Sequence, residues 1–265
     1  MATALITGAT SGIGLTFAQH LARQGYDIVL VARDARRLDE TAESITAATG
    51  RHVEAMRADL SDRSDVARVA QRLSAGERPV EVLVNNAGFG IHQPLASEDG
   101  VEHEKAIEVM CRAVLVLGGV AAKAMTSRGV GMIINVSSTA GFMALGGYSA
   151  VKAWVTAYSE SLSVELRGSG VQVTALCPGW VRTEFHQRAG LSTSSIPSWL
   201  WVDSDQVVAT ALKDAGRGKV ISIPTMRYRG LMWCVHHLPR GAVRAISGKI
   251  TSKRKGPKPG GEEAR

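Results

Sequence analysis

The sequence has few of the features that mark exported, metal-binding or membrane-spanning proteins. Its three cysteines, Cys111, Cys177 and Cys234, lie far apart, so neither a disulfide framework nor a cysteine metal site is expected. Residues 2–6 begin an apolar run without a basic leader or cleavage site, and no stretch approaches the ~18 uninterrupted apolar residues of a spanning helix. These absences favour a protein of the reducing cytoplasm with no bound metal.

Positive charge is concentrated near the C-terminus. The chain carries a formal charge of +7, and residues 226–265 hold ten Lys or Arg and two Glu. Residues 1–225 therefore carry a charge close to neutral, −1. Because no basic patch with interleaved aromatic residues or DNA-binding motif is present, nucleic acid is not expected as a partner.

Short β-branched runs alternate with amphipathic segments along most of the chain. This alternation implies a parallel sheet with helices on both faces, and 45% apolar residues suffice for a large α/β core. The sequence predicts strands at residues 2–7, 27–32, 53–58, 80–85, 130–136, 171–177 and 219–223. It predicts helices at residues 12–24, 35–48, 62–74, 101–127, 148–167 and 203–214.

A glycine-rich turn follows the first predicted strand and leads directly into a helix. Strand, turn and helix together allow backbone amides and a helix N-terminus to hold a pyrophosphate. The alternative is a glycine turn that only packs the helix on the strand. The predicted dinucleotide contacts in this turn are Gly8, Thr10, Ser11, Gly12, Ile13 and Gly14.

The end of the second predicted strand indicates which dinucleotide binds. An NAD site places an acid here for the ribose 2′-hydroxyl, whereas Arg33 suits a 2′-phosphate, so NADP(H) is preferred over NAD(H). The alternative is that Arg33 and the arginines after it form a solvated helix start. Asp59 and Leu60 end the third strand, and Asp59 either contacts the adenine amino group or caps the helix that starts near Ser61.

Tyr148 and Lys152 are four residues apart in a predicted helix and so share one face. A free tyrosine has a pKa near 10, and a neighbouring cation favours the phenolate. The pair predicts a tyrosine general acid/base whose pKa is lowered by Lys152. Such spacing is common on helices, so its weight depends on the motifs around it.

Five motifs in order make residues 2–225 similar to the classical short-chain dehydrogenase/reductase family. They are Thr-Gly-x-x-x-Gly-x-Gly at 7–14, Asn-Asn-Ala-Gly at 85–88, Ser138, Tyr-x-x-x-Lys at 148–152, and Pro-Gly at 178–179. The resemblance implies one Rossmann-type domain with a doubly wound, seven-stranded parallel sheet. It also implies hydride transfer between a nicotinamide and a carbonyl or alcohol.

The resemblance assigns catalytic roles to three side chains. Tyr148 would give a proton in reduction and take one in oxidation, and Lys152 would lower its pKa and bind the nicotinamide ribose. Ser138, rather than Ser137, would hold the substrate oxygen, and Thr183 would bind the nicotinamide carboxamide. The further cofactor contacts that it implies are Asn86, Ala87, Gly88, Pro178, Gly179 and Val181.

Two departures from the family pattern leave other functions open. Met110 stands where the family carries an asparagine, and a thioether is a weak acceptor without a donor. Ser138 and Tyr148 are closer in sequence than is usual, so the glycine-containing loop 141–147 must be tight. The alternative is a catalytically weak protein that senses NADP(H) or acts as a scaffold. A nucleotide-sugar epimerase or dehydratase is a third reading, for which the C-terminal region leaves little room.

The expected substrate lid, about residues 180–202, is rich in apolar and aromatic residues. It suggests a small-molecule hydrophobic carbonyl or alcohol, such as a 3-oxoacyl group, a steroid or another lipid, although a core cluster or subunit contact is an equal alternative. His186 is expected to be a surface residue.

The remaining segments bear on partners and location. Residues 226–247 mix apolar and basic side chains, so they pack as a helix on the domain or a partner subunit, or lie on an anionic membrane. Residues 248–265 have the composition of a disordered tail. The apolar helix around 113–120 and the helix that carries Tyr148 resemble the family's homodimer and homotetramer interfaces.

Overall fold

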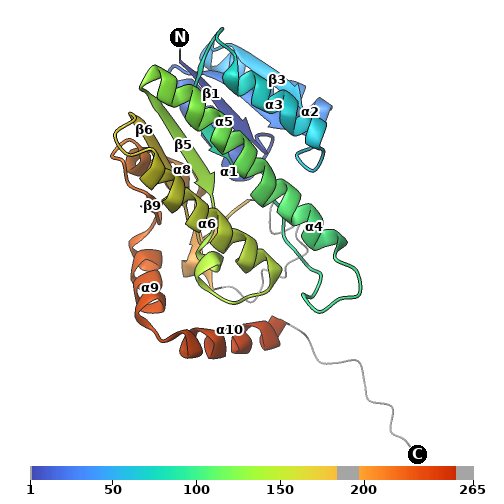
Figure 1. Cartoon of the computed structure of the whole chain (residues 1–265), viewed down its shortest axis with the longest axis vertical. Coiled ribbons are helices and arrows are strands. Elements are labelled where there is room, and N and C mark those ends of the chain that lie inside the picture. Colours follow the sequence, from blue (N-terminus) through green and yellow to red (C-terminus); the bar gives the residue numbers. More distant parts are fainter. Residues whose placement is uncertain (1, 184–196, 255–265) are drawn as a thin grey trace, which may run out of the picture.

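A parallel seven-stranded sheet forms the centre of the computed structural model, which describes residues 2–183 and 197–254 (Figure 1). The strand order is β3-β2-β1-β4-β5-β6-β9, so the winding direction reverses between β1 and β4. In doubly wound sheets, ligands bind at such a switch point, beyond the carboxyl ends of the strands. The strands are β1 (Thr3–Thr7), β2 (Asp27–Ala32), β3 (Val53–Arg57), β4 (Val80–Asn85), β5 (Gly131–Val136), β6 (Val171–Leu176) and β9 (Ile221–Ser222).

Helices cover both faces of the sheet, which confirms the predicted fold class. Alternate strand residues serve opposite layers: Leu5 packs in the core with α3, α5 and α6, while Ile6 packs with α1, α2 and α8. Figure 1 shows α5 and α6 in front of the sheet and α1 and α8 behind it. The helices are α1 (Gly12–Arg23), α2 (Ala35–Thr49), α3 (Arg63–Ser74), α4 (Val101–Ile107), α5 (Ala113–Arg128), α6 (Gly147–Glu165) and α8 (Ser204–Ala215).

The predicted helix at 101–127 is a continuous helical segment with a π-helical turn in its middle. Residues Glu108–Arg112 form this turn between α4 and α5. Val101–Arg128 is long and apolar enough to cross a membrane, but 56% of its most apolar window is buried inside the fold. It therefore has the surroundings of a core helix.

Several elements differ from the prediction. Strand β9 has two residues rather than the predicted 219–223, and β7 (Trp180–Val181) pairs with β8 (Trp201–Val202) in a separate two-stranded sheet. The last two helices are α9 (Met226–His237) and α10 (Arg240–Arg254). Helix α10 continues past residue 248, where a disordered tail is predicted, and residues 255–265 lie outside the described part.

The C-terminal helices pack on the domain through one side. Tyr228 and Met232 of α9 and Val243 and Ser247 of α10 are buried. Ser247 Oγ accepts a hydrogen bond from the backbone N–H of Ala144 at 3.1 Å, so α10 supports the loop that precedes α6. Burial of this stripe explains why the helix persists beyond residue 248. The subunit interface on α5 and α6 stays a prediction.

Candidate active site

The turn between β1 and α1 is held by the end of β4. Asn86 Nδ2 donates to the carbonyl oxygens of Thr7 (2.9 Å) and Gly8 (3.1 Å). In return, Thr7 Oγ1 accepts from the backbone N–H groups of Asn86 (2.9 Å) and Ala87 (3.0 Å). The two strands at the topological switch point are thereby joined, and the shape of the turn is fixed by Asn86 rather than by glycine alone.

Two glycines of the turn are required by its geometry. Gly8 has a φ of +64°, a conformation that favours glycine. A Cβ atom at Gly14 would lie 2.3 Å from the Gly8 carbonyl oxygen and 2.4 Å from Asn86 Nδ2, which is too close for any side chain. Gly12 lies beside Thr183, whose Cβ would be 3.1 Å from an added Cβ. The structure thus brings Thr183 to the predicted phosphate turn.

The turn fits the pyrophosphate of a dinucleotide. The first amides of α1 have no carbonyl acceptor within their own helix, and the N-cap Ser11 makes no side-chain capping bond to them. The positive end of the helix dipole adds to their attraction for an anion. Thr10, Ser11, Gly12 and Ile13 are partly exposed around this N-terminus, as such contacts require.

Arg33 is an exposed cation at the end of β2. It forms no ion pair with another described residue, whereas Arg36 pairs with Glu40 on the surface of α2 at 2.6 Å. Asp59 Oδ1 accepts from the backbone N–H (3.0 Å) and hydroxyl (2.7 Å) of Ser61. Although burial opposes ionisation, these bonds and the Arg33 charge hold the pKa of Asp59 below its usual value.

Asp59 was expected either to contact the adenine or to cap the following helix, and the structure bears on the second of these. The N-cap of α3 is Asp62, which accepts from the amides of Ser64 and Asp65. Asp59 therefore caps a turn before the helix and not the helix itself, and it lies at the carboxyl end of the sheet as an adenine contact requires. Leu60 is buried in the core.

Ser138, Tyr148 and Lys152 meet beyond the carboxyl end of β5. The hydroxyl of Ser138 lies close enough to the phenol of Tyr148 to favour its ionised form, so the short loop between them does bring the two groups together. The Lys152 Nζ lies 5.6 Å from the centre of the Tyr148 ring and donates to the Val136 carbonyl oxygen at 2.9 Å. Ser137 instead bonds the Lys152 carbonyl oxygen at 2.7 Å, within the core.

The pKa of Tyr148 differs from the prediction. Burial raises it to about 12, and the hydrogen bond from Ser138 only partly opposes this shift. The expectation that Lys152 lowers the pKa is therefore corrected. The ammonium faces the Val136 carbonyl oxygen, and desolvation of the phenolate outweighs its attraction to a cation at this distance.

Lys152 is itself almost fully buried. Burial lowers the pKa of its ammonium to about 8, while the nearby thiols of Cys111 and Cys177 act in the opposite direction. Burial also raises the pKa of both thiols to about 11, so they are neutral at physiological pH. Lys152 is consequently the charged member of this group near neutral pH.

Met110 lies in the π-helical turn and is fully buried. Its Sδ would be 3.0 Å from a Cβ added at Gly88, and Lys152 Nζ would be 3.6 Å from the same point. A thioether therefore stands beside the lysine where the resemblance implies an asparagine. π-Helical turns often occur at functional sites, which is consistent with this placement.

A buried chain of polar side chains beside the site was not predicted from the sequence. Asn85 Nδ2 donates to Asn135 Oδ1, and Asn135 Nδ2 donates to Ser159 Oγ, both at 2.9 Å. These bonds tie β4 to β5 and β5 to α6. The sequence does contain a signal for these bonds, because an asparagine occurs near the end of each of two neighbouring apolar strands.

Tyr228 is a further residue that sequence reasoning missed. Its ring lies against Gly179, where an added Cβ would be 1.9 Å from the ring carbon Cζ. Its hydroxyl accepts from the Trp180 N–H at 3.0 Å and donates to the Leu200 carbonyl oxygen at 2.9 Å. One phenol from α9 therefore joins both ends of the expected lid.

The Pro178–Gly179 motif also contacts the catalytic loop. The Pro178 carbonyl oxygen accepts from the backbone N–H (3.0 Å) and hydroxyl (3.2 Å) of Thr139. Val181 is buried and pairs with Val202, so its side chain belongs to the core. The predicted lid residues Phe185, His186, Arg188, Leu191 and Ile196 lie outside the described part of the chain.

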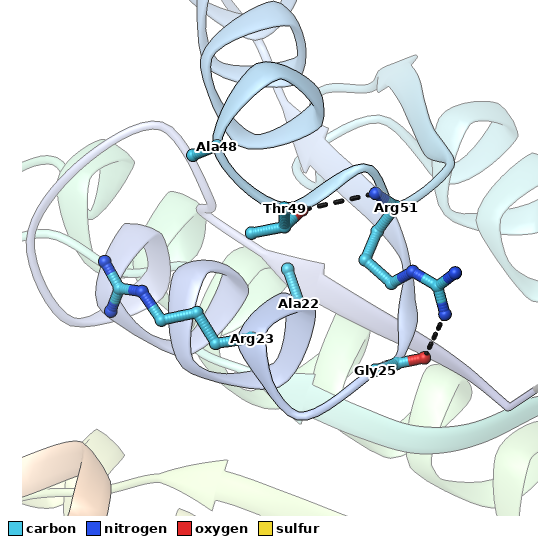
Figure 2. Close-up of a pocket in the computed structure, with 6 residues that line it drawn as sticks. All are labelled: Ala22, Arg23, Gly25, Ala48, Thr49 and Arg51. Carbon is cyan, nitrogen blue, oxygen red and sulfur yellow. Dashed lines mark hydrogen bonds between the residues drawn. The ribbon is translucent and has the colours of Figure 1, made fainter.

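A surface hollow of about 420 Å³ lies elsewhere, at the C-terminal ends of α1 and α2 (Figure 2). The Arg51 guanidinium there is bound to the Gly25 carbonyl oxygen at 2.8 Å, and the Arg23 side chain points away from it. Its lining residues include no carboxylate, histidine or cysteine, and the Thr49 hydroxyl is bonded to the Ile45 carbonyl oxygen at 2.7 Å. Residues 2–183 and 197–254 contain no group of three His, Cys, Asp or Glu side chains placed to hold a metal.

Comparisons with known proteins agree with this geometry. The sequence profile of the short chain dehydrogenases matches residues 2–192. The chain is 34% identical over 195 residues to glycine betaine reductase ATRR of Emericella nidulans, a match that covers 72% of this chain and 15% of that protein. It is 35% identical over 197 residues to the very-long-chain 3-oxoacyl-CoA reductase of Anas platyrhynchos, covering 69% and 61%.

The match thus spans less than two thirds of the length of each of these two relatives. The match to one solved structure spans nearly the whole of both chains. The short-chain dehydrogenase of Sphingobium yanoikuyae in complex with NADPH has a TM-score of 0.80 and 33% identity, over 98% of this chain and 99% of that one.

Proposed function

This chain belongs to the short-chain dehydrogenase family, and from that premise we propose that it is an NADP(H)-dependent oxidoreductase acting on the carbonyl or alcohol group of a hydrophobic substrate. One observation carries the proposal. The phenol of Tyr148 lies beside the hydroxyl of Ser138 and the ammonium of Lys152, at the carboxyl edge of the sheet where the dinucleotide turn also lies.

The cofactor would be held by the turn between β1 and α1 and by the ends of β2, β3 and β4. The amides at the start of α1 would bind the pyrophosphate, and Arg33 would bind a 2′-phosphate. Support for NADP(H) comes from the exposed Arg33 and from the NADPH complex of the similar structure. The chemistry supplied by a bound nicotinamide is hydride transfer.

The side chains of the site would transfer one proton to the substrate. With its pKa raised to about 12, the Tyr148 phenol is protonated at neutral pH and is ready to donate to a carbonyl oxygen during reduction. The phenol O–H bond breaks as the alcohol O–H bond forms, and the phenolate that remains lies beside the Ser138 hydroxyl and the Lys152 ammonium.

Support for a hydrophobic substrate comes from the ends of the expected lid. Trp180 and Trp201 lie with their ring centres 6.0 Å apart, and Trp199 is exposed nearby. The similarity to a very-long-chain 3-oxoacyl-CoA reductase points the same way, whereas the similarity to a glycine betaine reductase does not. The proposal of a hydrophobic substrate therefore rests on the aromatic residues at the ends of the lid.

The second candidate is a catalytically weak NADP(H) sensor. Two features of the sequence favour it, the short loop before Tyr148 and Met110. The loop no longer supports it, because Ser138 reaches the phenol. Met110 is its remaining support.

The test is the initial rate of NADPH oxidation with ketones and 3-oxoacyl thioesters of graded chain length, with NADH as the comparison. We expect turnover that prefers NADPH and rises with chain length. Arg33→Glu should reverse the cofactor preference, while Arg23→Glu, an exposed charge away from the site, should leave it unchanged. Equal use of NADH and NADPH by the unaltered protein would contradict the cofactor assignment.

A further inference from the structure

Helix α9 has apolar side chains on two opposite faces. Tyr228 and Met232 are one turn apart and are buried against the domain. Met226 and Trp233 are seven residues apart, which places them on one side, and they are 75% and 64% exposed. A helix that only covered its own domain would carry polar residues on its outer side.

The exposed apolar residues of the described chain gather on this end of the molecule. Five of the thirteen exposed large apolar side chains belong to α9, α10 and the turn between them. Figure 1 shows these helices running along one edge of the domain, away from the sheet. We call four of these side chains the outer C-terminal face: Met226, Trp233, Leu238 and Ile246.

The charge around this face has one sign. No Asp or Glu occurs between residues 215 and 261, which includes all of α9 and α10. Arg229 is bound to Asp214 of α8 at 3.6 Å, and Arg227 donates to the Trp199 carbonyl oxygen. Arg240 and Arg244 are exposed beside the outer C-terminal face. Apolar and basic side chains are therefore mixed along two helices that contain no acidic residue.

We propose that the outer C-terminal face docks on an anionic lipid bilayer. Trp, Met and Leu suit the boundary between head groups and acyl chains, and exposed basic side chains are attracted to anionic head groups. A second copy of this chain fits less well, because a symmetric contact would place the same basic residues against each other. The basic residues therefore favour docking on an anionic bilayer over contact with a second copy of the chain.

The docked face lies close to the candidate active site. The opposite side of α9 carries Tyr228, whose hydroxyl joins the two ends of the expected lid. Helix α10 contacts the loop before Tyr148 through Ser247. Only the thickness of one helix, about 10–12 Å, separates the outer C-terminal face from these contacts.

The experiment is flotation of the full chain with phosphatidylcholine vesicles, with and without phosphatidylglycerol. We expect binding to the anionic vesicles only, and release when the ionic strength is raised from about 0.05 to about 0.5 M. Replacing Arg240 and Arg244 by Gln should weaken partitioning by roughly 30-fold, about fivefold for each charge. Trp233→Ala and Ile246→Ala should weaken it at unchanged charge.

Matched controls come from the far side of the domain. Val130 is 49% exposed, similar to the 42% of Ile246, and Val130→Ala should have no effect on flotation. Replacing the exposed Arg23 and Arg78 by Gln removes two charges elsewhere and should also have none.

Equal binding to both vesicle types, or binding that survives the Arg240 and Arg244 replacements, would overturn the proposal. So would a change of oligomeric state in Trp233→Ala, measured by light scattering, because the face would then be a subunit contact. Circular dichroism of each variant shows that it is folded, so loss of flotation is not loss of structure.

Discussion

Replacement of Tyr228 by Phe tests whether the C-terminal helix holds the substrate lid. The change removes only the hydroxyl and keeps the ring that packs against Gly179. Two hydrogen bonds are lost, the one accepted from the Trp180 N–H at 3.0 Å and the one donated to the Leu200 carbonyl oxygen at 2.9 Å. No other residue is disturbed directly.

The expected cost follows from these two contacts. A buried donor or acceptor left without a partner costs about 1–3 kcal/mol. The lid is near the surface, so water can reach part of the site, and we expect a loss of roughly 2 kcal/mol in the free energy of unfolding. For a domain of this size that corresponds to a fall of about 4–8 °C in Tm.

The assay is thermal unfolding followed by circular dichroism, together with steady-state kinetics. Tyr26→Phe serves as the control, because the structure shows no hydrogen bond for the Tyr26 hydroxyl among the described residues. We expect Tyr228→Phe to raise the KM for a large ketone more than it changes the KM for NADPH, because both ends of the lid loosen. A Tm equal to that of Tyr26→Phe, with unchanged KM values, would refute the reasoning.

Three further predictions concern the site. Gly14→Ala should weaken NADPH binding at least tenfold in titration calorimetry, because its Cβ would lie 2.3 Å from the Gly8 carbonyl oxygen; unchanged affinity would contradict the role of the turn. Because the Lys152 ammonium has a pKa of about 8, ketone reduction should fall above that pH, by about tenfold per unit, and a flat profile to pH 10 would contradict this. Met110→Asn should leave turnover within about threefold, whereas a gain of about a hundredfold would favour the sensor.

The fold could be predicted because its signal is local. Alternating strand and helix patterns give the seven strands and the helices between them to within a few residues, although β9 is shorter than predicted. The end of the chain was harder to predict, because α10 is held by a contact between Ser247 and Ala144, which are 103 residues apart. No periodicity in the sequence indicates such a pairing.

The candidate site was predictable in its members but less so in its energetics. Four-residue spacing places Tyr148 and Lys152 on one face of α6, and the structure brings Ser138 to them. Spacing does not reveal burial, and burial decides the pKa values of both groups. Tyr228 was missed because its contacts with Trp180 and Leu200 join segments 48 and 28 residues away.

The central claim is that Tyr148 donates the proton in an NADPH-dependent reduction. The most direct measurement is the single-turnover rate of NADPH oxidation by Tyr148→Phe, with Tyr158→Phe as the control and NADPH affinity measured for both. We predict that Tyr148→Phe still binds NADPH and turns over at least ~100-fold more slowly, since a positioned acid contributes about 10²–10⁴-fold. A Tyr148→Phe protein that reduces the ketone within about threefold of the unaltered rate would contradict the account.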